Sequence, residues 1–83
     1  MNMAIFQNRL QARQSLDESH VAIFGKRRQR SGEPYSVDDV LSQVKAASRL
    51  GLSLDQHAGL LGIMPAQLRP YKDYVEQFCA DDC

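Results

Sequence analysis

Residues 52–74, LSLDQHAGLLGIMPAQLRPYKDY, form the stretch of this 83-residue chain that decides the fold we expect. Ser53 and Gln56 have the spacing of a capping box, in which the serine hydroxyl accepts from the third helical N–H and the glutamine side chain reaches back to the cap. A helix should therefore begin directly after the serine. Gly62 should end it after two turns, because glycine tolerates the left-handed conformation at a helix C-terminus. Pro65 suits the first position of a second helix, so the stretch predicts two short helices joined by a tight turn.

Apolar and small residues in this stretch fit a closely packed helix pair. Ala58 is small enough for the two helices to approach, and Gly62 follows four residues later at the turn. The apolar positions that would hold the pair together are Leu61, Ile63 and Leu68. The pattern resembles the helix-turn-helix signature of small bacterial and phage DNA-binding regulators, over residues 52–74 only.

The resemblance implies a protein that regulates transcription by binding DNA as a dimer. In that case Gln67 and Arg69 would face base edges or phosphates from the second helix. Lys72 would hold the DNA backbone, and loss of Arg69 would reduce discrimination among DNA sequences.

Two features of the same stretch favour an alternative of a different class. Met64, Pro65 and Ala66 stand where DNA-reading members usually show polar residues, and Pro70 should end the second helix near Arg69 or kink it there. The alternative is a non-enzymatic adaptor or antagonist from a phage, plasmid or secretion system that presents a helical face to a protein partner. Its contact would be an exposed patch of Met64, Leu68 and Tyr71.

Length and composition predict one soluble domain. Hydrophobic residues make up 43% of the chain and charged residues 24%, which is ordinary for a globular protein and excludes full disorder. No apolar run approaches the ~18 residues that span a bilayer, and residues 1–10 lack the apolar core of a secretory signal. We therefore expect a cytoplasmic protein with no membrane association.

The net charge of zero hides a difference between the two halves of the chain. Six basic and three acidic residues give residues 1–35 a charge of +3, whereas four basic and seven acidic residues give residues 36–83 a charge of −3. The main basic cluster lies in residues 25–34, GKRRQRSGEP, and comprises Lys26, Arg27, Arg28 and Arg30. It is either a solvated loop that keeps the protein soluble or an arm that grips DNA phosphates or an acidic protein surface. In the sequence it lies outside residues 52–74, although a nucleic-acid binder usually concentrates its positive charge where it meets phosphate.

The whole chain predicts an all-α bundle of four or five short helices. Residues 1–24 should form a helical arm, with Ile5, Phe6 and Leu10 on one face and with Ser15 and Glu18 marking a fresh helix start or a kink. We favour helix for the ambiguous residues 20–24, HVAIF. Residues 25–35 form a basic linker, and residues 36–80 a helical unit. Ser36 should cap its first helix, which ends at Gly51 and has an apolar stripe of Val37, Val40, Leu41, Val44, Ala47 and Leu50.

The last helix carries an apolar face with two interpretations. Its residues are Tyr71, Tyr74, Val75 and Phe78. They would form either the seam of a homodimer or the side of the helix that closes the core of the monomer.

The sequence predicts no catalytic, cofactor or metal site. His20, His57, Cys79 and Cys83 lack the ligand spacing of a zinc site. We expect Cys79 to be a small apolar group beside the core, Cys83 to be a loose terminal thiol, and His57 to be half-exposed or hydrogen-bonded. No nucleophile motif, acid–base pair or glycine-rich phosphate loop is present, so the protein should not be an enzyme.

Overall fold

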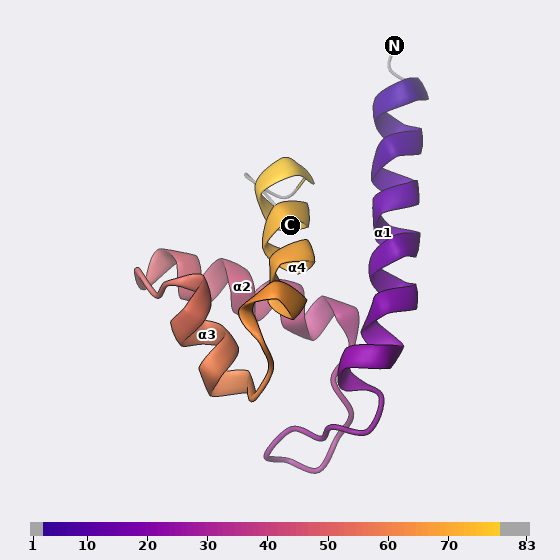
Figure 1. The fold of residues 1–83 in the computed structure, drawn as a ribbon. Coiled ribbons are helices and arrows are strands. Elements are labelled where there is room, and N and C mark those ends of the chain that lie inside the picture. Colours follow the sequence, from indigo (N-terminus) through magenta and orange to yellow (C-terminus); the bar gives the residue numbers. More distant parts are fainter. Residues whose placement is uncertain (1–2, 79–83) are drawn as a thin grey trace.

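The structure is a computed structural model that describes residues 3–78, with side chains described from residue 8 onward. Four helices make up this part of the chain: α1 (Met3–Phe24), α2 (Val37–Arg49), α3 (Leu54–Leu61) and α4 (Pro65–Phe78). Figure 1 shows α1 standing beside the other three helices, with the segment between α1 and α2 forming a loop at one end of the molecule. The predicted all-α fold is confirmed.

Capping boxes begin α2 and α3. The Ser36 hydroxyl accepts from the N–H of Asp39 at 3.0 Å, and the Asp39 carboxylate accepts from the N–H of Ser36 at 3.1 Å. The Ser53 hydroxyl accepts from the N–H of Gln56 at 3.1 Å, and the Gln56 side chain accepts in return at 2.9 Å. The predicted start of α3 is therefore confirmed, and its end is too, because Gly62 adopts the left-handed conformation with φ of 75°.

Helix α4 organises the core, since it contacts each of the other three helices. It buries Leu68 and Tyr71 completely. These residues meet an apolar stripe on α2, the small Ala58 of α3, and Leu16 and Phe24 of α1. The buried part of the α2 stripe is as predicted, namely Val37, Val40, Leu41, Val44 and Ala47. Leu50 was wrongly included, because it follows the end of the helix and is 79% exposed.

Of the two effects predicted for Pro70, an end of the helix near Arg69 or a kink there, the end is wrong. Helix α4 continues through Pro70 to Phe78, so the segment after Pro70 is no separate helix. Proline in a helix interior removes one backbone hydrogen bond. Leu68 precedes Pro70 and Tyr71 follows it, and both side chains are buried. Because the helix continues through Pro70, both lie on the face of α4 that packs in the core.

Helix α1 lies within the predicted arm of residues 1–24 and is one helix. It is unbroken through Ser15, so the spacing of Ser15 and Glu18 marks neither a start nor a kink. The last five residues are helical as predicted, with Phe24 buried in the core. Leu10 is half-exposed, and the side chains of Ile5 and Phe6 lie outside those described.

Candidate nucleic-acid interface

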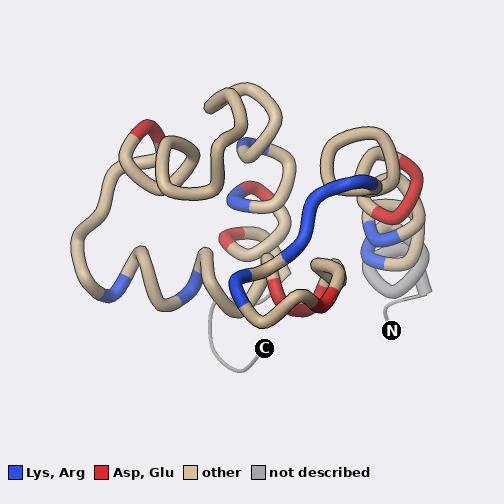
Figure 2. Tube along the Cα trace, turned by 90° about the horizontal axis from the view of Figure 1, so that it is seen from below, with Lys and Arg blue, Asp and Glu red and all other residues tan. Residues whose placement is uncertain are grey.

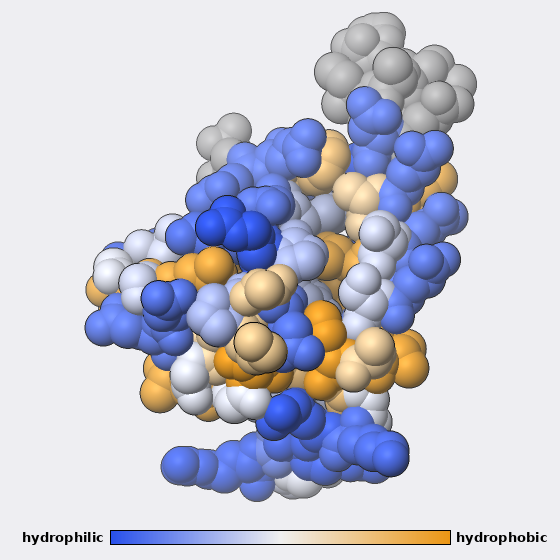
Figure 3. All heavy atoms as spheres, viewed as in Figure 1, coloured by the Kyte–Doolittle hydropathy of each residue, from blue (hydrophilic) through white to orange (hydrophobic). Residues whose placement is uncertain are grey.

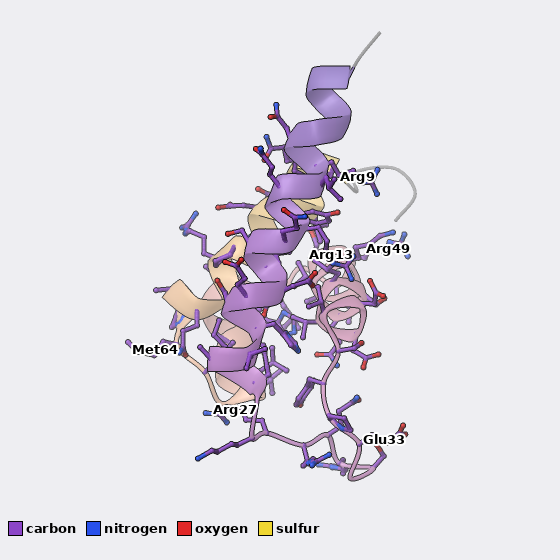
Figure 4. All side chains as sticks on the ribbon, turned by 90° about the vertical axis from the view of Figure 1, so that its right-hand side faces the viewer. Arg9, Arg13, Arg27, Glu33, Arg49 and Met64 are labelled. Atoms are coloured by element: carbon purple, nitrogen blue, oxygen red, sulfur yellow. The ribbon has the colours of Figure 1, made fainter. Side chains whose placement is uncertain are left out.

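The basic loop and the turn between α3 and α4 meet in space. A Cβ atom on Gly62 would lie 3.1 Å from Nη1 of Arg27, so the guanidinium group lies directly against the turn. Figure 4 shows Arg27 just beyond the end of α1, with Met64 projecting from the other side of the turn. A cationic cluster that is remote from residues 52–74 in sequence is thereby brought to their surface.

The loop is built around one half-buried side chain, Gln29. Its N–H donates to the carbonyl of Glu33 at 2.8 Å, and its carbonyl accepts from the N–H of Gly32 at 2.9 Å. Its side-chain amide donates to the carbonyl of Pro34 and to the carboxylate of Asp39, each at 3.1 Å. The predicted linker is therefore a folded turn attached to the start of α2. Hydrogen bonding from Ser36, and to a smaller degree from Gln29, lowers the pKa of Asp39.

The cations around Gln29 are exposed. Lys26, Arg27, Arg28 and Arg30 all lie at the surface. Figure 2 shows the run Lys26–Arg28 crossing the lower face of the molecule, and Figure 3 shows the loop as a hydrophilic layer beneath apolar residues. Among the described side chains, ion pairs within 4 Å join Arg13 to Asp17 and to Asp38, and none involves the four loop cations. No described carboxylate, including that of Glu33 in the same loop, therefore forms an ion pair with a loop cation.

The first half of α4 continues this surface. Met64 is 66% exposed and Arg69 is exposed, whereas Gln67 and Lys72 are half-buried. No Asp or Glu occurs in residues 56–72, and carboxylates return on α4 only with Asp73 and Glu76. Seven of the eight predicted contact residues thus lie on the loop, beside the turn or in the first half of α4, whereas Lys72 lies farther along α4 and lines a pocket with residues of α2 and α3.

Gln67 has a structural contact that the sequence analysis missed. Its side-chain oxygen accepts from the N–H of Met64 at 2.9 Å, and its own N–H donates to the carbonyl of Met64 at 2.9 Å. The side chain therefore satisfies a backbone donor at the start of α4. The spacing from Met64 to Gln67 matches half of a capping box, which could have indicated this role.

His20 is a second residue that the sequence analysis missed. Its Nε2 atom lies 2.8 Å from the backbone carbonyl of Tyr35, and its Nδ1 atom lies 2.8 Å from the hydroxyl of Tyr71. A carbonyl can only accept, so Nε2 carries the proton and the Tyr71 hydroxyl donates to Nδ1. The imidazole thus joins α1, α4 and the chain just before α2, and fixes both ends of the basic loop relative to α4. Burial, with a smaller contribution from the charge of Asp17, raises the pKa of Tyr71 to about 12.

The apolar face of α4 is used inside the monomer. Tyr71, Tyr74 and Val75 are buried in the core, and Phe78 packs against it with its ring 5.1 Å from that of Tyr74. Of the two interpretations, closure of the core is the one observed, and a homodimer would need another surface. The predicted patch for a protein partner is wrong for the same reason, since Leu68 and Tyr71 are fully buried and only Met64 is exposed.

Of the two alternatives predicted for His57, half-exposed or hydrogen-bonded, the first is wrong. It is buried beside residues of α2 and α4, and this burial lowers its pKa. Cys79 and Cys83 lie outside the described residues. In residues 3–78, no group of three or more His, Cys, Asp or Glu side chains is placed to hold a metal ion. No helix in that range has the length and apolar character needed to cross a bilayer.

Comparisons of the chain with protein-family models, curated proteins and solved structures found no match. The geometry of the loop, the turn and α4 is therefore the basis for assigning a function.

Proposed function

We propose that this protein is a small regulator that binds double-stranded DNA through a surface we call the loop–turn surface. This surface comprises the basic loop, the turn at Gly62 and the first half of α4. The observation that carries the proposal is the contact of the Arg27 guanidinium group with that turn. It places the chain's densest positive charge beside an exposed helix start.

Electrostatics supports a polyanionic partner. Cations that neutralise DNA phosphates release condensed counterions, and this release supplies most of the sequence-independent affinity. The four loop cations are exposed and make no ion pair with a described side chain, so binding would not require breaking such a pair. Gln29 holds the loop in one folded arrangement, which lowers the entropy lost when a ligand binds.

A binding experiment with charge-matched variants tests the proposal. Genomic fragments would be assayed by gel shift at low and moderate salt, with wild-type protein, Arg28→Gln and Arg49→Gln. Figure 4 shows Arg49 on α2, away from the loop. Arg28→Gln should weaken binding and reduce the steepness of its salt dependence by about one unit of slope, whereas Arg49→Gln should bind as wild type does. Failure of wild-type protein to retain any fragment would reject DNA binding.

A different observation favours a second candidate, a non-enzymatic adaptor or antagonist that binds a protein. Leu50 is 79% exposed and Leu60 is 76% exposed, and both line an apolar groove of about 240 Å³ between α2 and α3. Gathered apolar side chains on a surface often mark a protein contact. The test is to capture partners from a nuclease-treated lysate with wild type, Arg28→Gln and Leu60→Ser. A protein that wild type and Arg28→Gln retain but Leu60→Ser loses would favour the adaptor over DNA binding.

A further inference from the structure

We infer that the loop–turn surface recognises the backbone of duplex DNA with little discrimination between base sequences. This inference rests on the proposed function and specifies the class of DNA that is bound. It follows from how few hydrogen-bond donors and acceptors the first residues of α4 have for contacting a base edge.

Gln67 is half-buried and held against the backbone, which hinders the contact by which glutamine reads adenine. That contact needs the side-chain oxygen to accept from the adenine amino group while the side-chain amide donates to the ring nitrogen. Here the oxygen of Gln67 already accepts from the N–H of Met64 at 2.9 Å. Rotating the side chain outward to reach a base edge would leave that N–H without its partner at the start of the helix, which costs binding energy.

The neighbours of Gln67 add almost no hydrogen-bonding capacity. Met64, Pro65 and Ala66 are exposed but carry no side-chain donor or acceptor suited to a base edge. Farther along α4, the carboxylates of Asp73 and Glu76 would meet DNA phosphates with unfavourable charge. Among exposed residues in the first half of α4, Arg69 alone has a side chain that can contact a base in a bidentate manner.

These limits give an expected size for the discrimination. One bidentate arginine–guanine contact distinguishes bases by roughly tenfold to a hundredfold. Sequence-specific proteins typically reach about 10³ to 10⁷ over non-specific DNA. The four loop cations, by contrast, would contact phosphates that every sequence shares. If they all do so, the slope of log affinity against log salt is about −3.6.

The test is to enrich a randomised pool of labelled duplexes over several rounds of binding and to compare the best sequence with the unselected pool by fluorescence anisotropy. At one fixed salt concentration, the two affinities should differ by less than about a hundredfold. Gln67→Ala should leave this ratio unchanged, whereas Arg69→Ala should lower it. The stability of each variant would be checked by urea unfolding.

The possible outcomes separate the two proposals. A ratio above about a thousandfold, in the range of specific regulators, would overturn this inference and leave DNA binding intact. A Gln67→Ala variant that keeps the fold but binds the best sequence and the unselected pool equally would also overturn it. Failure of every duplex to bind at low salt would reject DNA binding itself and this inference with it.

Discussion

The hydroxyl oxygen of Tyr71 lies 2.8 Å from Nδ1 of His20, and this contact joins α4 to the last turns of α1. The same imidazole donates through Nε2 to the carbonyl of Tyr35. Two segments that flank the basic loop are therefore tied to the helix that carries Arg69. The hydrogen bond is partly buried, so its loss should be measurable as a change in stability.

We expect Tyr71→Phe to lower the free energy of unfolding by about 1 to 2 kcal/mol, because Nδ1 of His20 would lose its donor while the aromatic ring stays in place. Urea unfolding followed by circular dichroism measures the change. Tyr35→Phe is the matched control, since His20 contacts the backbone carbonyl of Tyr35 and that group is retained. An equal loss in both variants would show that the hydroxyl of Tyr71 has no special role.

Stability should also fall at alkaline pH through Tyr71. Its pKa is raised to about 12 in the folded protein, from its usual value of 10.0. Between these values the folded protein keeps a proton that the unfolded chain releases, so stability falls as pH rises, by at most about 1.4 kcal/mol per pH unit. Urea unfolding from pH 9 to 12 would show the effect as a difference between wild type and Tyr71→Phe. Parallel profiles would contradict it.

His57 should produce the opposite dependence at acidic pH. Burial lowers its pKa below the usual value of 6.5, so the unfolded chain takes up a proton before the folded protein does as pH falls. This contribution to stability is present above pH 6.5 and is lost as pH falls toward the lowered pKa. Unfolding curves from pH 7.5 to 5 should show a steeper loss for wild type than for His57→Gln. A loss of the same steepness in the variant would assign the effect to other groups.

Two glycines three residues apart, Gly59 and Gly62, should respond in opposite directions to replacement by alanine. Gly62→Ala should destabilise the protein by about 1 to 2 kcal/mol, because alanine is strained at a φ of 75°. Its Cβ would also lie 3.1 Å from Arg27. Gly59→Ala should stabilise by about 0.5 to 1 kcal/mol, because that glycine is helical and nothing lies within 4 Å of an added Cβ. Thermal unfolding of both variants checks the pair, and a stabilising Gly62→Ala would contradict the left-handed turn.

Replacing the proline inside α4 should stabilise the fold. Pro70→Ala restores an N–H that can donate within the helix and removes the clash of the ring with the preceding turn, which together are worth about 3 kcal/mol, while the unfolded chain gains flexibility worth about 1 kcal/mol. The net gain expected from these two effects is about 2 kcal/mol, measured by urea unfolding. Pro65→Ala is a suitable control, because proline is well tolerated at the first position of a helix. Destabilisation of Pro70→Ala alone would mean that the proline ring makes a packing contribution larger than the restored bond.

Local sequence patterns predicted the elements whose causes are local. The capping box at Ser53 and the left-handed Gly62 set the two ends of α3, and each depends on neighbours within a few residues. Pro70 was misjudged because its local cost is outweighed by burial of Leu68 and Tyr71, which only the packed structure reveals. His57 was misjudged for the same reason, since its sequence neighbours do not show which helices cover it.

The candidate site was predicted only in part. Its residue types were found from charge and from the helix pair, but the proximity of Arg27 to Gly62 depends on how α1 packs against α4. The partners of His20 lie 15 and 51 residues away in the chain, so no local pattern could reveal them.

The carboxylate of Asp39 accepts from both Ser36 and Gln29, and so belongs to the helix cap and to the folded loop at once. Natural variation in these two regions should therefore be correlated. Replacing Asp39 would remove both the cap of α2 and the hydrogen bond that holds Gln29 in the loop. Ser36, Gln29 and Asp39 should therefore vary together among related sequences.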